Sequence, residues 1–126
     1  MILFVCVHNA GRSVMAEAFA LAAGLEAQSA GTVGGAAPHP EVVTVMAELG
    51  IDVGGHRARV LTDDMVASAG RVITMGCAVD DQACPAIRYA NVEDWGLADP
   101  KGQPIDRVRE IRDEIRARVE AIAVED

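Results

Sequence analysis

Aromatic side chains are scarce in this sequence: one tryptophan, one tyrosine and two phenylalanines make up 3% of its 126 residues. The hydrophobic core must therefore be built from aliphatic side chains, methionine and alanine. Basic residues are also few, because 11 lysines and arginines stand against 19 acidic residues, which gives a net charge of −8. This balance argues against a general surface for nucleic acids or anionic membranes. An anionic ligand would need a local nest of positive groups.

The apolar run that opens the chain is too short for a signal peptide or a transmembrane helix. MILFVCV has no basic residue ahead of it and is cut off by His8 and Asn9. We therefore expect a cytoplasmic protein, in which thiols are kept reduced. The three cysteines of the sequence then fit reactive or metal-binding thiols better than a structural disulfide framework.

Strands and helices are predicted to alternate along the chain, with no repeat or linker between them. Strands are predicted at 2–7, 27–31, 71–76 and 91–95, and helices at 12–24, 40–50, 61–70 and 105–122. The last helix carries apolar residues at helical spacing on one face. Residues 1–126 are therefore predicted to form a single α/β domain, an open parallel sheet of about four strands flanked by helices.

In a parallel α/β sheet, ligands bind beyond the carboxyl ends of the strands. Three predicted loops reach that edge and carry chemically active side chains. The loop after the first strand follows Cys6, the loop after the third contains Cys77 and Cys84, and the loop after the fourth contains Asp99. We expect the functional site to form where these loops meet.

The segment VCVHNAGRS, residues 5–13, joins the first predicted strand to the first helix. Its backbone N–H groups and the dipole of the helix form a cradle for an oxyanion. Arg12 adds a planar fork suited to a tetrahedral oxyanion, and the same field stabilises a thiolate at Cys6, to which Ser13 could donate a hydrogen bond. The residues predicted to bind the substrate are Val7, His8, Asn9, Ala10, Gly11, Arg12 and Ser13.

Taken alone, the pattern C-x5-R-S is short, and it also arises by chance as a buried cysteine beside an unrelated surface arginine. Its position between a buried strand and a helix favours a functional loop. The wider sequence resembles the low-molecular-weight tyrosine phosphatase superfamily, and in particular its arsenate-reductase branch. The resemblance rests on CVHNAGRSVMAEAF, on SAG at 29–31, on GIDVGGHRAR from Gly50 and on DWGLADP from Asp94, in that order. It covers nearly the whole chain.

Cys77 and Cys84 lie in GCAVDDQACP. Their spacing is not typical of zinc sites, so a metal site, two unrelated loop thiols and a redox relay are the alternatives. The resemblance implies the relay: Cys6 forms an arseno-cysteine, Cys77 attacks Cys6 and releases arsenite, and Cys84 then attacks Cys77. It also implies that thioredoxin reduces the resulting Cys77–Cys84 disulfide, and that no metal or cofactor takes part.

Asp99 alone would be an ordinary turn residue, stiffened by Pro100. The resemblance implies that it is the general acid that protonates the departing oxygen. Phosphatases of the superfamily commonly place a tyrosine after this Asp-Pro pair, whereas Lys101 and Gly102 follow here. The change argues against a surface that recognises phosphotyrosine. Trp95 is expected to pack under this loop.

Glu17 is either one exposed position on a helix or part of an ion site. In some arsenate reductases, residues that match Asn9, Glu17 and Ser29, with an aspartate further on, bind potassium. Ungapped matching of HRAR puts Arg59 at the aspartate position, where its guanidinium could pair with Glu17. We therefore expect no potassium requirement. His8 is expected to point outward rather than to favour the thiolate, and His39 and His56 to be structural or exposed.

Three functions follow from these residues. The first is a thioredoxin-coupled arsenate reductase that acts through Cys6, Arg12, Cys77, Cys84 and Asp99. The second is a phosphomonoester hydrolase of the low-molecular-weight phosphatase type, which uses Cys6, Arg12 and Asp99 alone. The third is a non-catalytic redox sensor that signals through a disulfide-dependent loop change. The cysteine pair is the feature that separates the first two, because a plain phosphatase needs neither thiol.

Overall fold

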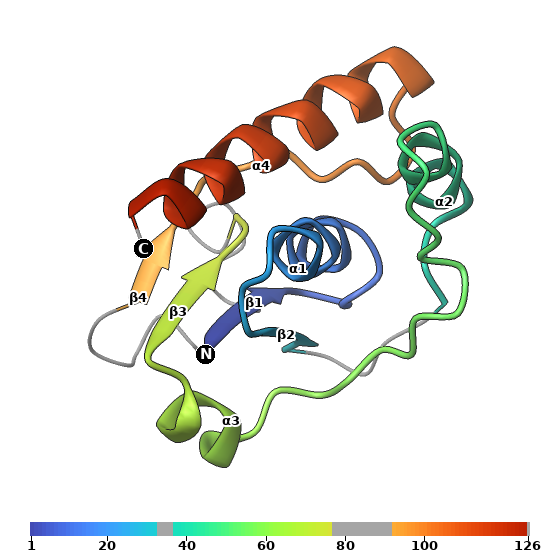
Figure 1. Ribbon diagram of the computed structural model, residues 1–126. Helices are drawn as coiled ribbons and strands as arrows, with labels where there is room; N and C mark the ends of the chain where they lie inside the picture. The colour runs from blue at the N-terminus through green and yellow to red at the C-terminus, as the bar shows by residue number, and fades with distance from the viewer. Residues whose placement is uncertain (33–36, 77–91, 126) are drawn as a thin grey trace.

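The computed structural model describes residues 1–32, 37–76 and 92–125, and strands and helices alternate along this part of the chain (Figure 1). The strands and helices are β1 (Ile2–Cys6), α1 (Arg12–Ala22), β2 (Ala27–Gly31), α2 (Pro40–Ala47), α3 (Asp63–Ser68), β3 (Arg71–Thr74), β4 (Val92–Asp94) and α4 (Ile105–Glu125). Every strand and helix predicted from the sequence is present. The helix expected at 40–50 is shorter: it ends at Ala47, and the chain turns at Gly50, whose φ is +77°.

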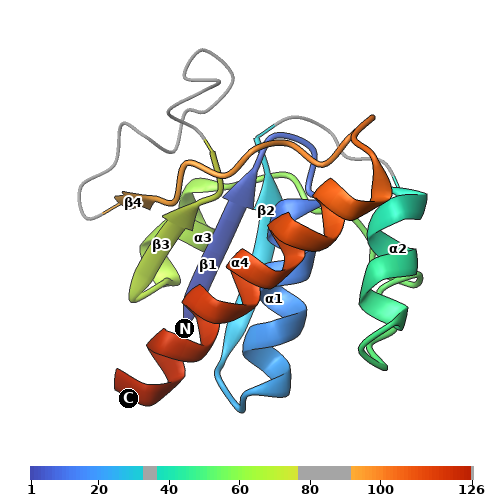
Figure 2. The same cartoon turned by 90° about the horizontal axis from the view of Figure 1, so that it is seen from above.

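The four described strands form one parallel sheet in the order β2-β1-β3-β4. The predicted open parallel α/β sheet flanked by helices is confirmed. Helices α1 and α4 cover one face and α3 the other, while α2 lies beyond the β2 side (Figures 1 and 2). Because the strands are parallel, their carboxyl ends meet at one edge, and the loop from β1 to α1 begins there.

The residues of β1 alternate between two hydrophobic clusters, as the period of a strand requires. Phe4 and Cys6 face the main core beneath α1, α2 and α4, while Leu3 and Val5 face a smaller cluster that includes Met65 of α3. All five residues of β1 are buried. The strand that leads to the predicted loop is therefore fixed from both faces.

Helix α4 is amphipathic, as the sequence predicts. Its buried apolar residues are Val108, Ile111, Ile115, Val119 and Ile122, while Ile105 is half-buried. Near the amino-terminal end of the helix, Arg112 donates to Glu48 Oε1 at 2.7 Å and to the carbonyl of Val45 at 2.9 Å. Hydrogen bonds from Arg109 and Arg112 keep the pKa of Glu48 below its usual range. These contacts fasten α4 to the end of α2.

Trp95 packs against the main hydrophobic core, and its expected position under the loop that carries Asp99 stays a prediction. Its ring lies 5.8 Å from that of Phe4, and the guanidinium of Arg118 lies 5.6 Å from the Trp95 ring centroid. None of the helices in the described ranges is both long and apolar enough to cross a membrane.

We predict that Ile115→Ala destabilises the fold by about 2–5 kcal/mol, because it leaves a cavity in the core. Ile115 is fully buried between α4 and the sheet. The control is Val124→Ala at the end of the same helix, where the side chain is 86% exposed and the change should stay within about 0.5 kcal/mol. Urea unfolding measures both, and equal effects would contradict the assignment of the core face.

Candidate active site

The loop of residues 7–11, here called the anion loop, connects β1 to α1 by a tight backbone turn. Asn9 adopts a left-handed conformation with φ +53°, which asparagine tolerates better than most residues. The loop also lies against Gly31: a Cβ on that glycine would approach the carbonyl oxygen of Val7 to 2.8 Å and the nitrogen of Asn9 to 2.9 Å. Glycine at the end of β2 therefore allows the loop to fold back onto the sheet edge.

Cys6, Ser13 and Asn9 form a buried hydrogen-bonded chain. The Ser13 Oγ lies 2.8 Å from the Cys6 Sγ and accepts a hydrogen bond of 2.8 Å from the Asn9 Nδ2. Since the amide supplies its own proton to the Ser13 oxygen, the hydroxyl proton is free to point at sulfur. The hydroxyl can therefore donate to a thiolate at Cys6, as the sequence predicts.

The side chain of Asn9 is held from its other end by the segment 56–59. Its Oδ1 accepts hydrogen bonds from the His56 Nε2 at 2.9 Å and from the Arg59 backbone N–H at 3.0 Å. Burial lowers the pKa of His56; the nearby Glu17 carboxylate opposes this shift and Arg59 adds to it. A neutral imidazole must then carry its proton on Nε2 to make this bond. His56 thus has a structural role in the loop, as expected.

Arg12 begins α1 with a buried side chain that is 5% exposed. Its Nη1 donates to the Leu97 carbonyl at 2.9 Å and to the Met75 carbonyl at 3.3 Å. Gly76 packs against the same guanidinium, since a Cβ there would approach the Leu97 carbonyl oxygen to 2.7 Å and collide with the Arg12 Nη1. Arg12 therefore connects the anion loop to the segments that follow β3 and β4.

A hollow opens in front of Cys6, between the anion loop and the segment after β4. Its lining residues are Cys6, Val7, His8, Ala10, Gly11, Arg12, His39 and Asp99. Asp99 is exposed, and its Oδ1 accepts a hydrogen bond of 3.0 Å from the Lys101 N–H, which closes the turn at Pro100. The structure thus brings together the predicted nucleophile, cation and acid.

The other predicted substrate-binding residues occupy two kinds of position. Asn9 and Ser13 are fully buried, and they support Cys6 from behind the loop rather than line the hollow. His8 is exposed. His39 also lines the hollow, although we expected it to be structural or exposed. Its position before Pro40 gives no sequence signal for this, because nothing in the pattern joins residue 39 to the loop.

Cys77 and Cys84 lie outside the described residues. The described chain reaches Gly76, whose N–H donates to the Asp94 Oδ1 at 3.0 Å. The Thr74 hydroxyl donates to the same oxygen at 2.7 Å. These two bonds fasten the end of β3 to the end of β4, one residue before Cys77.

Glu17 is not a freely exposed helix position. Its side chain is 13% exposed, it accepts a hydrogen bond from the Ser29 hydroxyl, and it lies 3.5 Å from the Arg59 Nη1. Arg59 also donates to the Ser29 carbonyl at 3.4 Å. The guanidinium of Arg59 therefore supplies the positive charge beside Glu17. No group of three or more metal-ligating His, Cys, Asp or Glu side chains occurs within the described ranges.

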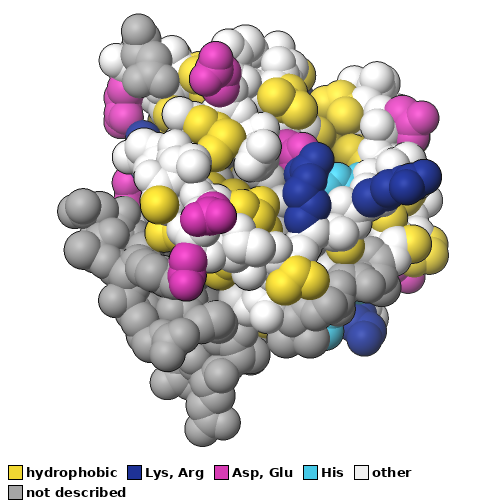
Figure 3. Space-filling view, turned by 90° about the horizontal axis from the view of Figure 1, so that it is seen from below, with side chains coloured by type: hydrophobic (Ala, Val, Ile, Leu, Met, Phe, Trp, Pro, Cys, Tyr) yellow, Lys and Arg dark blue, Asp and Glu magenta, His cyan; other side chains and the backbone are white. Residues whose placement is uncertain are grey.

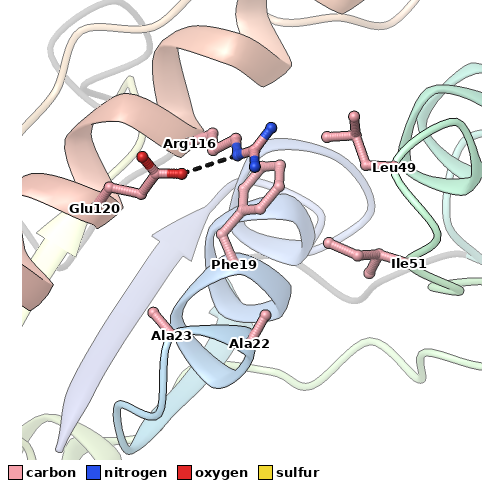
Figure 4. A pocket seen from close by; sticks show the side chains of 7 residues that line it. All are labelled: Phe19, Ala22, Ala23, Leu49, Ile51, Arg116 and Glu120. Atoms are coloured by element: carbon pink, nitrogen blue, oxygen red, sulfur yellow. Dashed lines mark hydrogen bonds and ion pairs between the residues drawn. The ribbon is translucent and has the colours of Figure 1, made fainter.

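A second hollow lies between α1, α4 and the segment after α2 (Figure 4). Phe19, Leu49 and Ile51 give it apolar walls, and the charge of Arg116 is paired with Glu120 at 2.9 Å. On the face shown in Figure 3, the few basic side chains lie mostly in the right half of the view, two of them on either side of a histidine. Because Arg116 is the one basic side chain that lines this second hollow, its described lining offers no unpaired positive group to an oxyanion. The hollow in front of Cys6 is thus the candidate active site.

The fold and this site, with a thiol, a guanidinium and a carboxylate around one small hollow, are those expected of an enzyme that acts on oxyanions. The chain belongs to the low molecular weight phosphotyrosine protein phosphatase family, whose profile matches residues 1–125. It is 41% identical over 124 residues to the "putative arsenate reductase" of Halobacterium salinarum, a match that covers 92% of this chain and 85% of that protein.

Two solved structures extend the comparison. One, described as an arsenate reductase in the phosphate binding state, is 33% identical with a TM-score of 0.82, and the match covers 98% of this chain and 96% of that chain. The other, the YwlE arginine phosphatase from Geobacillus stearothermophilus, is 28% identical with a TM-score of 0.83, and the match covers 98% of this chain and 90% of that chain. The resemblance seen in the sequence is confirmed, and the chain is similar both to proteins named arsenate reductase and to a protein named arginine phosphatase.

We predict that Ser13→Ala slows alkylation of Cys6 by iodoacetamide at neutral pH by about 10- to 100-fold, since a hydrogen bond to a charged group contributes about 1.5–3 kcal/mol and each 1.4 kcal/mol is a factor of ten. Mass spectrometry of the peptide that contains Cys6 separates it from the other two cysteines. The matched control is Ser68→Ala, at an exposed position of α3, which should leave the rate unchanged. An unchanged rate in Ser13→Ala would show that the hydroxyl does not stabilise the thiolate.

The pairing of Arg59 with Glu17 predicts no response to potassium. The melting temperature and the alkylation rate of Cys6 should be the same in potassium chloride and sodium chloride at equal ionic strength. In Arg59→Asp, Glu17 faces a second carboxylate with no counter-cation, so stability should fall and depend on the added cation. A clear potassium effect on the unsubstituted protein would contradict the structural pairing.

Proposed function

We propose that this protein reduces arsenate to arsenite. The observation that carries the proposal is the placement of the Cys6 sulfur, 2.8 Å from the Ser13 hydroxyl, at the floor of a hollow that Arg12 and Asp99 also line. A nucleophile, a buried cation and an acid around one small anion pocket match the needs of arsenate chemistry. Likeness to proteins named arsenate reductase supports this choice of oxyanion.

In the first step, the Cys6 thiolate attacks arsenic(V) and forms a sulfur–arsenic bond. One arsenic–oxygen bond breaks, and Asp99 protonates the departing oxygen so that it leaves as water. Arg12 and the N–H groups of the anion loop hold the remaining oxygens. Arsenic stays pentavalent in this step. The product is an arseno-cysteine on Cys6.

In the second step, the Cys77 thiolate attacks the Cys6 sulfur. The sulfur–arsenic bond breaks and its electron pair stays on arsenic, which leaves as arsenite. Two thiols are thereby oxidised to a Cys6–Cys77 disulfide while arsenic gains two electrons. Gly76, the last described residue before Cys77, packs against the guanidinium of Arg12. This approach of the chain to the anion pocket supports Cys77 as the second nucleophile.

In the third step, the Cys84 thiolate attacks the Cys77 sulfur and releases the Cys6 thiolate. The resulting Cys77–Cys84 disulfide no longer involves the buried Cys6, which is 5% exposed. A dithiol protein of the thioredoxin type in the cytoplasm then reduces it and is itself oxidised. No metal or cofactor takes part in these three steps.

A second function shares the first half of this chemistry. A phosphomonoester hydrolase would use Cys6 to attack phosphorus and Asp99 to protonate the leaving alcohol, and water would then release phosphate. Membership of a phosphatase family and likeness to an arginine phosphatase favour it. It gives no role to Cys77 or Cys84. A redox sensor would use the cysteines without turnover.

We predict that Cys84→Ser stops arsenate reduction after one turnover, because the Cys6–Cys77 disulfide is then not resolved. The measurement is arsenate-dependent NADPH oxidation with thioredoxin and thioredoxin reductase, compared with the unsubstituted protein. Mass spectrometry of the stalled variant should detect a Cys6–Cys77 disulfide. Ser68→Ala serves as the control and should turn over normally.

Other outcomes of this experiment identify the alternatives. Steady hydrolysis of a phosphomonoester at the same rate in both proteins, without arsenate-dependent oxidation, would establish the phosphatase. An absence of turnover with either oxyanion in folded, reduced protein would leave the sensor. Reduction that proceeds with a low-molecular-weight thiol and glutaredoxin, but not with thioredoxin, would overturn only the choice of reductant.

A further inference from the structure

His39 forms one wall of the hollow in front of Cys6, although it belongs to neither the anion loop nor the segment after β4. Its ring lies over Gly11, where a Cβ would approach the His39 Cδ2 to 3.2 Å and its Nε2 to 3.7 Å. The Pro100 ring flanks the same glycine, at 3.1 Å from that Cβ position. Because residue 11 is glycine, an imidazole can lie close against the anion loop.

The backbone around His39 is fixed by contacts on both sides. The His39 N–H donates to the Ala10 carbonyl at 3.0 Å, and the His39 carbonyl accepts from the Val43 N–H at 3.0 Å as α2 begins. Pro40 occupies the first turn of the helix and constrains the backbone. The imidazole is therefore held at the anion loop by the start of α2, and its position does not depend on a flexible connection.

The side chain of His39 does not cap α2, the helix that it precedes. His39 is the N-cap of α2, a position that favours Ser, Thr, Asp or Asn because their side chains accept a hydrogen bond from the first turn. Its side chain makes no capping bond. The half-buried ring also has no hydrogen bond to any other residue in the part of the chain that the structure describes. A residue that would cap α2 better is therefore absent at this position, and the imidazole of His39 lines the hollow in front of Cys6 instead.

We propose that His39 is a substrate-binding residue, whose ring N–H donates a hydrogen bond to an oxygen of the oxyanion held by the anion loop. Imidazole carries a proton on one or both nitrogens. The ring edge nearest Gly11 is the one formed by Cδ2 and Nε2. The remaining pocket side chains include one cation, Arg12, and one carboxylate, Asp99. His39, at the start of α2, would add a donor from an element separate from the anion loop. This inference rests on the proposed oxyanion chemistry of the site.

The test compares His39→Asn with His39→Gln, using inorganic phosphate as a probe that cannot be reduced. Asparagine is a strong N-cap but is too short to reach the anion, so the melting temperature of His39→Asn should equal or exceed that of the unsubstituted protein. Its affinity for phosphate, measured by isothermal titration calorimetry, should fall about tenfold, as expected for loss of a hydrogen bond to a charged group. Glutamine extends an amide donor further, so His39→Gln should keep most of the affinity.

Steady-state kinetics with arsenate supply a second measurement. Loss of a contact that substrate and transition state share raises KM about tenfold in His39→Asn and leaves kcat nearly unchanged. Thr44→Ala, at an exposed position of α2, is the control and should alter neither affinity nor stability. A purely structural role for His39 would make affinity follow the melting temperature.

Unchanged phosphate affinity in His39→Asn would overturn the proposal. If the unsubstituted protein bound neither phosphate nor arsenate, the proposed function itself would fail. Failure of the His39 contact alone would leave phosphate binding and arsenate turnover intact in every variant. The two failures are therefore distinguishable.

Discussion

The two hydrogen bonds from the Arg12 guanidinium to backbone carbonyls hold the site together. Their acceptors, Met75 and Leu97, belong to segments that follow different strands, while Arg12 itself begins α1. A buried guanidinium with unpaired donors is costly, so these carbonyls offset the cost of burial and at the same time fix the direction of the charge. The anion pocket forms because one side chain links three segments at the same edge of the sheet.

The electrostatics of the site are local. With a net charge of −8, the protein as a whole repels anions, and the face shown in Figure 3 carries few basic side chains. Attraction must come from groups within contact distance: the loop N–H groups, the dipole of α1 and Arg12. Water-filled gaps of a few ångströms would weaken such short-range interactions, which explains why the loop is packed so closely against Gly31 and the ring of His39 against Gly11.

Most of the fold could be predicted from the sequence, because its signals are local. The apolar run of β1 and the apolar face of α4 each depend on neighbouring residues, and the structure contains both. The placement of Cys6, Arg12 and Asp99 followed from the geometry of a parallel sheet. The roles of Cys77 and Cys84 stay predictions, since both lie outside the described residues.

The parts that sequence reasoning missed are long-range contacts without a pattern. The carbonyls that hold Arg12 lie 63 and 85 residues away along the chain, and any residue type could supply them. His39 reaches the pocket through a backbone bond to Ala10, which no side chain encodes. The pairing of Arg59 with Glu17 was expected only because a resemblance aligned the two positions. Local sequence patterns predict secondary structure, whereas tertiary contacts determine which polar side chains line the hollow in front of Cys6.

The anchoring of Asn9 by residues 56–59 has a consequence for heat inactivation. This segment belongs to no helix or strand, and backbone hydrogen bonds between Gly31 and residues 59 and 61 fasten it to the sheet edge. Segments of this kind open locally at a lower free energy than the packed core. Their release would free Asn9, and through it Ser13 and the thiol, while the sheet and α4 stay folded. On heating, activity should therefore be lost below the melting temperature of the protein, in a transition that far-ultraviolet circular dichroism does not detect.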